Sequence, residues 1–193
     1  MWNLGVQYIT EKYGKAGDLR LNQNSLCGTI KDQTERALWE VKNVIDCIPN
    51  DEWDACYCGM PLFKHVYHML HSLDRWMINP SDRSYTEPPF HVEGLNDLDA
   101  VTDTSLSRGQ MNGYFSAIAA RITSYVSSLT DDVLLQKPDG CAYTRFTLIL
   151  AQFRHLHTHM GMLMGFTVAI TGRWPRVVGL VGEIPKREYD PFL

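Results

Sequence analysis

The chain has 193 residues, a formal net charge of −4 and a sequence isoelectric point near 5.9. This length is enough to bury one hydrophobic core without disulfides or a structural metal, so we expect a single domain over residues 1–193. The acidic balance excludes the basic stripe of a nucleic-acid-binding protein, and the longest apolar run, 160–170, is about half the length that spans a bilayer.

Five cysteines follow neither a zinc pattern nor a disulfide framework, which suits a reducing cytosol. We interpret them as mostly buried thiols; for Cys56-Tyr-Cys58, placed before an expected helix, a lowered thiol pKa is the weaker alternative. The first residues, MWNLGVQYITEKYGK, lack the pattern of a signal peptide. We therefore expect a soluble, cytoplasmic protein.

In chain order, residues 1–28 carry no sustained period and predict an irregular or partly helical lead-in. From Thr29, apolar residues recur at steps of three and four, which predicts a helix with Thr29 or Asp32 as its N-cap and Pro49 as its stop. A second helix is expected to open at Met60-Pro61 and to end at Asn79-Pro80.

Residues 79–104 form a long connection, which is unusual inside a compact domain unless it has a role. A third helix is predicted from Asp103 or Ser105 to Leu129, and a fourth from a cap at Thr144 to about Gly172. The bundle core would span about 29–172, followed by an extended tail at 173–193. Few strand signals accompany these helices, so the fold class is all-α, a four-helix bundle with long connections.

The fourth helix contains the segment QFRHLHTHMGMLMGF, in which His155 and His159 lie about 40° apart on one helical face. Two imidazoles in this register can direct two ring nitrogens at one metal ion. For a single histidine, a core residue bonded to a backbone carbonyl is the commoner explanation; for the pair, a metal site is favoured.

A third ligand must come from another helix. The second helix carries histidines at 65, 68 and 71. On a helical wheel His65 flanks the apolar stripe, whereas His68 lies toward polar residues, so periodicity alone favours His65.

The segments MPLFKHVYHMLHSLDRWM and HLHTHMGML resemble the motifs of the DinB/YfiT-like superfamily of four-helix-bundle metal proteins. That family has a proline seven residues before its second-helix ligand and an aromatic residue eight after it, which Pro61, His68 and Trp76 match. The resemblance therefore implies His68, His155 and His159 as metal ligands and leaves His65 as the runner-up. The family's glutamine after HxxxHxG is replaced by Met162 here.

Three neutral imidazoles would bind a divalent transition metal, with Zn, Ni or Fe expected first and Cu also compatible. Such a metal could activate water for hydrolysis or bind a thiol as the nucleophile. The resemblance implies a metal-dependent hydrolase or an S-transferase using a low-molecular-weight thiol such as bacillithiol or mycothiol, with a small-molecule substrate. The alternatives are a non-catalytic metal-binding or stress-response protein, with copper held near Met160, Met162 and Met164, and a dimeric scaffold whose metal site has decayed.

The catalytic acid or base stays unassigned. Asp74 is placed too close to the outer face. Asp97, Asp99 and His91 are candidates for which a solvated loop position is the favoured explanation, and for Tyr143 a buried structural role is an equal explanation. The fourth helix is apolar nearly all round, and Gly161 and Gly165 would permit a close helix neighbour, so we expect a homodimer.

Overall fold

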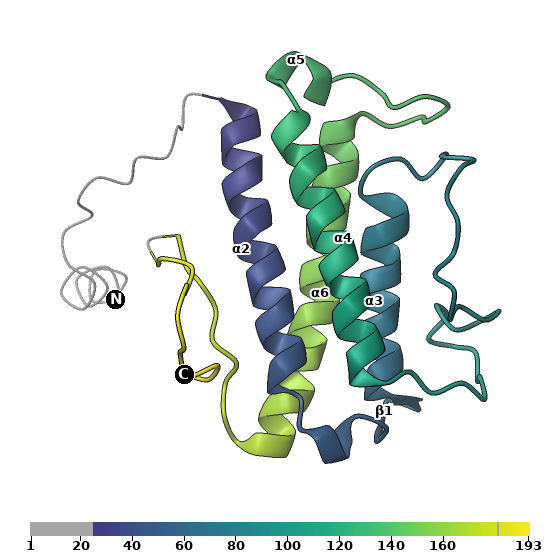
Figure 1. Ribbon diagram of the computed structural model, residues 1–193, viewed down its shortest axis with the longest axis vertical. Coiled ribbons are helices and arrows are strands. Elements are labelled where there is room, and N and C mark those ends of the chain that lie inside the picture. Colours follow the sequence, from purple (N-terminus) through teal and green to yellow (C-terminus); the bar gives the residue numbers. More distant parts are fainter. Residues whose placement is uncertain (1–24, 181) are drawn as a thin grey trace, which may run out of the picture.

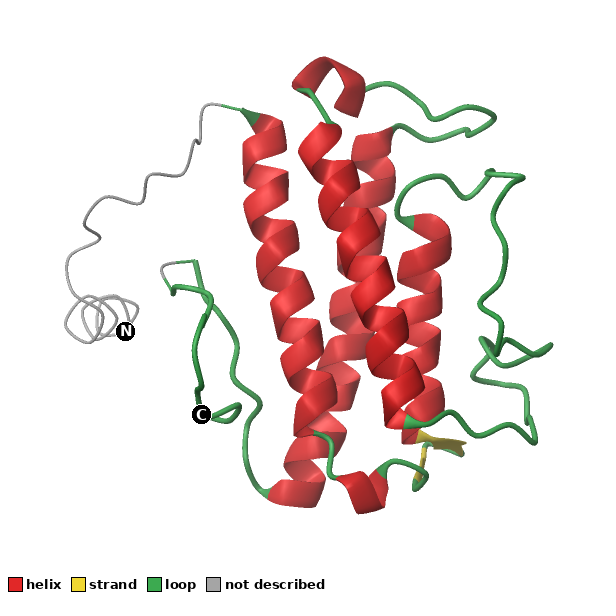
Figure 2. Ribbon diagram, viewed as in Figure 1, coloured by secondary structure: helices red, strands yellow, loops and turns green. Residues whose placement is uncertain are grey.

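A computed structural model describes residues 25–180 and 182–193. Within these residues four long helices lie side by side: α2 (Leu26–Cys47), α3 (Leu62–Trp76), α4 (Arg108–Ser128) and α6 (Arg145–Thr171) (Figure 1). A turn of 3₁₀ helix η1 (Asn50–Glu52), the two-residue strands β1 (Cys56–Tyr57) and β2 (Met60–Pro61), and the short helix α5 (Asp131–Leu134) connect them (Figure 2). The predicted all-α class is therefore confirmed.

Each long helix packs against two others. Helix α3 contacts α4 and α6, and α2 contacts the same two helices from the other side. Apolar side chains from all four meet between them, with Val44, Val66, Ile122 and Ile149 fully buried. This explains why α6 is apolar nearly all round: two of its faces are covered by helices of its own chain. Leu156 and Met160, two apolar residues of this helix, are buried in the core of the chain itself, so these two do not require a second chain to cover them.

Local capping fixes the ends of the helices. Helix α6 begins after Thr144, whose side chain accepts from the Thr147 amide, and ends at Gly172 in the left-handed conformation (φ 70°), both as predicted. Helix α4 begins later than predicted, because Ser107 and Gln110 form a capping box that neither Asp103 nor Ser105 offers. Helix α2 begins earlier than Thr29, at Leu26, with Ser25 as its cap.

The predicted lead-in over 1–28 lies mostly outside the described residues, and its last three residues belong to α2. The predicted start of the second helix is also shifted. Met60 and Pro61 pair with Cys56 and Tyr57 in an antiparallel hairpin, and α3 begins at Leu62.

The long connection between α3 and α4 runs along the outside of α3 (Figure 1). Three α3 side chains at helical spacing bind it: Lys64 donates from Nζ to the Ala100 carbonyl, His68 Nδ1 lies 2.7 Å from the Asn96 carbonyl, and His71 contacts Glu87. Lys64 is only 1% exposed as a result. The α3 face that looked polar on the wheel is therefore covered by this connection.

The C-terminal tail lies along α2 (Figure 1). Arg36 donates to the carbonyls of Gly179 and Gly182, and Asn43 donates to those of Arg176 and Pro191. The tail thus covers an outer face of α2. Among the described residues, no helix has the length and apolar character needed to cross a membrane.

Candidate metal centre

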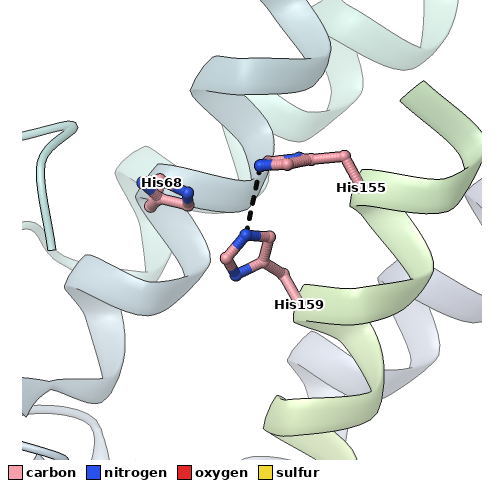
Figure 3. Close-up of side chains that lie close together, drawn as sticks. All are labelled: His68, His155 and His159. Carbon is pink, nitrogen blue, oxygen red and sulfur yellow. Dashed lines mark hydrogen bonds between the residues drawn. The ribbon is translucent and has the colours of Figure 1, made fainter. Parts of the chain in front are cut away.

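The three predicted ligands lie together between two neighbouring helices. His68 comes from the middle of α3, while His155 and His159 come from successive turns of α6 (Figure 3). Each offers one ring nitrogen, and these three nitrogens lie within 4.8 Å of one another. The ring centroid of His68 is 4.5 Å from that of His159 and 5.5 Å from that of His155. The arrangement could hold a metal ion.

A backbone carbonyl fixes the orientation of His68. Its Nδ1 lies 2.7 Å from the Asn96 oxygen, and because a carbonyl can only accept, Nδ1 carries the hydrogen. The lone pair of the neutral ring is then on Nε2. A carbonyl behind the ring is the usual support of a metal-binding histidine, since it fixes the tautomer and raises ligand basicity.

The α6 pair is equally close. His155 Nε2 and His159 Nε2 are 3.1 Å apart, as the dashed line in Figure 3 marks. Two nitrogens bound at about 2.0–2.1 Å to one tetrahedral ion are roughly 3.3 Å apart, so the pair needs little movement to share an ion. Both Nδ1 atoms are buried and have no hydrogen-bond partner. Three imidazole nitrogens are a donor set that suits a borderline divalent cation, and the two Nδ1 atoms would carry the hydrogens when Nε2 binds it.

The two α6 histidines are also in the protonation state of a ligand. Burial, followed by the neighbouring His68, His155 and His65, lowers the pKa of His159 to about 4. Burial, and then His68, lowers the pKa of His155. Both rings are therefore neutral at pH 7, and metal would not have to displace a proton from them.

His65, the histidine that periodicity favoured, lies outside this cluster. Its Nε2 is 2.8 Å from the Tyr57 carbonyl, and its ring packs edge-on against Phe166. It is thus a core histidine tied to the hairpin. The wheel located a buried histidine correctly but could not show which buried face meets His155 and His159.

The remaining sequence candidates fall in different places. The placement of Asp74 near the outer face is wrong: it is buried, pairs with Arg121 and accepts from Tyr114 at 2.9 Å. Asp99 and Tyr143 are exposed. Asp97 is exposed and accepts from the Asp99 amide. Among the described residues, none of these three carboxylates and one phenol forms a hydrogen bond to a ring nitrogen of His68, His155 or His159.

A second group that could hold a metal lies between α3 and the connection that covers it. It consists of His71, Glu87 and His91, one ligand atom from each lying within 4.8 Å of the others. Sequence reasoning treated His91 only as a possible base and gave no role to Glu87. The available signal was the four-residue spacing of Glu87 and His91 in a proline-containing segment, but nothing in the sequence paired them with His71.

Other features do not point to either group. A cavity of about 870 Å³ is lined by neither of them and lies between the loop after α3 and the loop before α6, near Arg83, Tyr125 and Arg145. The thiols of Cys56 and Cys58 are exposed, contrary to the expectation of mostly buried thiols, and lie in the hairpin rather than at a helix start. Met160 is buried in the core, which favours packing over copper binding.

No known family model matches this sequence, and neither a curated protein nor a solved structure matches the chain.

Proposed function

We propose that the protein is a metal-dependent enzyme built on a DinB-like four-helix bundle, with His68, His155 and His159 as the ligands of one divalent transition metal. The observation that carries the proposal is the approach of three ring nitrogens, from two helices, to within 4.8 Å of one another. The motif resemblance and this geometry both favour His68 as the ligand from α3, so two separate observations support the same ligand set.

The ligand set favours a reactive site over a structural one. Structural zinc sites are closed by four protein ligands, whereas three protein ligands leave a position for water or substrate. A divalent ion held by three neutral nitrogens would retain its full positive charge. It would supply Lewis acidity, either for activating water or for binding a thiol. We therefore propose a hydrolase or a low-molecular-weight-thiol S-transferase acting on a small molecule.

The chain's own residues would prepare this site in two ways. The Asn96 carbonyl holds His68 with Nε2 toward α6, and the fully buried Leu95 beside it anchors the connection against the bundle. The low pKa of His159 keeps its lone pair available well below neutral pH. Because the four helices bury a continuous core, the fold should not depend on the ion.

The test is elemental analysis and activity screening of protein purified without an affinity tag. Wild type is compared with His68→Ala, His155→Ala and His159→Ala, and His65→Ala is the control because it removes a buried histidine from the same helix as His68. We expect each ligand variant to lose one metal equivalent and the activity, with helix content retained. The control should keep the metal.

Four results would contradict the proposal. A metal content equal to that of the wild type in both His68→Ala and His155→Ala would exclude the three-histidine site. Loss of metal in His65→Ala alone would make that residue the ligand. Stoichiometric metal without hydrolysis or thiol transfer would favour the non-catalytic metal-binding protein, and a wild type that binds no metal after reloading would favour the scaffold with a decayed site.

A further inference from the structure

We propose that His71, Glu87 and His91 form a second divalent-cation site, which fastens the α3–α4 connection to the bundle. Two imidazoles and one carboxylate are the ligand set of catalytic zinc sites and of non-haem ferrous sites. The cation class is therefore Zn²⁺ or Fe²⁺ rather than the all-oxygen class of Ca²⁺ and Mg²⁺. This inference concerns ligands distinct from the three-histidine group and does not depend on it.

The geometry brings three different donors to one point. His71 Nε2 is 2.7 Å from Glu87 Oε2, and the same oxygen is 4.0 Å from His91 Nδ1. The rings of His71 and His91 stack with centroids 5.3 Å apart and planes 15° from parallel. The carboxylate oxygen thus lies close to nitrogens of both rings, and one ion could contact all three with small rotations of the side chains.

Burial makes this group different from a surface cluster. The side chain of His71 is 8% exposed and that of His91 is 17% exposed, whereas Glu87 is 43% exposed. Two ligands are therefore held by the fold while the third faces solvent. This leaves an open side through which an ion could enter and where water or substrate could complete its coordination.

A tyrosine competes for one of the donor atoms. Tyr67 Oη lies 2.6 Å from His91 Nδ1, and it is the group that a cation would displace from that nitrogen. Tyr67 is fully buried beside both rings, with its own ring 5.4 Å from that of His71. The phenol therefore orients His91 toward the cluster and becomes a neighbour of the bound ion.

The ligands come from two separate parts of the chain, helix α3 and the connection that follows it. His71 belongs to α3, while Glu87 and His91 belong to the segment whose Asn96 carbonyl supports His68. A cation shared by the three would tie that segment to α3 one helical turn beyond His68. A cation bound by His71, Glu87 and His91 should therefore order the connection whose Asn96 carbonyl orients His68.

The experiment removes the first site and asks whether metal binding remains. The double variant His155→Ala/His159→Ala is depleted of metal and titrated with Co²⁺, whose visible absorption reports nitrogen and oxygen ligation. We expect it to bind one Co²⁺ equivalent. Adding Glu87→Gln should weaken this binding by at least about tenfold, since the substitution keeps the shape and removes the anionic ligand. Glu93→Gln, an exposed glutamate of the same segment, is the matched control.

Hydrogen exchange provides a second readout. In the double variant, Co²⁺ should slow amide exchange in peptides covering 79–107, and Glu87→Gln should abolish this protection. A double variant that keeps its helix content but binds no Co²⁺ would overturn the proposal, as would Glu87→Gln binding as tightly as Glu93→Gln. Wild type and the double variant binding equal amounts of Co²⁺, with Glu87→Gln losing all of it, would retain this site and refute the three-histidine site.

Discussion

At the scale of single residues, Asp74 is a buried carboxylate at the centre of a polar network between α3 and α4. Its buried carboxylate pairs with Arg121 and accepts from the phenols of Tyr114 and Tyr85. We expect Asp74→Ala to lower the free energy of unfolding by about 2–4 kcal/mol, because three donors lose their shared acceptor. The expected loss of unfolding free energy is smaller than for a fully buried ion pair because the Arg121 side chain is 45% exposed. Urea denaturation followed by circular dichroism measures the change.

The matched control is Asp103→Ala, which removes an exposed carboxylate from the connection before α4 and should change the free energy of unfolding by less than about 0.5 kcal/mol. Equal effects of the two substitutions would show that the Asp74 network contributes no net stability. Asp74→Asn should be intermediate, since the amide oxygen can still accept from one phenol but carries no charge.

The candidate metal ligands show what the sequence could and could not predict. His155 and His159 were identifiable because helical spacing alone places them together. The choice of His68 over His65 needed the flanking Pro61 and Trp76, since a wheel of one helix contains no information about the segment that covers it. Glu87 was missed because its partner His71 is sixteen residues away across a connection without a period.

At the scale of elements, the start of α2 depends on a residue far along the chain. The carboxylate of Asp131, at the first turn of α5, accepts from the amides of Leu26 and Cys27 at 3.1 and 2.9 Å. These hydrogen bonds, led by the Cys27 amide, hold the pKa of Asp131 below its usual value. We expect Asp131→Asn to lower the melting temperature by a few degrees at pH 7, because the neutral amide cannot accept from both donors as well as a carboxylate.

The sign of the pH dependence follows from that lowered pKa. A carboxyl group whose pKa is lower in the folded state stabilises fully above its unfolded pKa, about 3.9, and loses this contribution as the pH falls through the folded value. The difference in melting temperature between wild type and Asp131→Asn should therefore be constant from pH 7 to about 5 and shrink below pH 4. A difference that persists unchanged at pH 2.5 would show that charge at this position is irrelevant. Asp132→Asn, an exposed neighbour in the same helix, serves as the control.

Helix interiors were predictable and several helix ends were not. Thr144 and Gly172 carry strong local signals, and both bound α6 as expected. The start of α2 combines a local cap, Ser25, with a carboxylate more than a hundred residues away, so no local pattern could place it fully. The hairpin formed by 56–57 and 60–61 was missed because Pro61 reads equally well as the first residue of a helix.

At the scale of the whole molecule, most apolar side chains of α6 are buried or half-buried within the one chain, yet one strip of the helix is exposed. Gly161 and Gly165 are exposed, and a methyl group added at either would meet no atom within 4 Å. We propose that the predicted homodimer would form at this strip, although apolar side chains of α6 such as Leu156 and Met160 are buried within the same chain. Close approach of a second helix would require both glycines to stay small.

We expect the wild-type chain to be a dimer by light scattering at micromolar concentration and Gly161→Gln to be a monomer, because the longer side chain would separate the helices. Gly113→Gln is the matched control: Gly113 is an exposed glycine of α4 with the same free space beside it. Both substitutions raise helix propensity by a similar amount, up to about 1 kcal/mol, so a change confined to Gly161→Gln cannot come from helix stability. A monomeric wild type, or equal dimerisation of the two variants, would remove the dimer from the description of this protein.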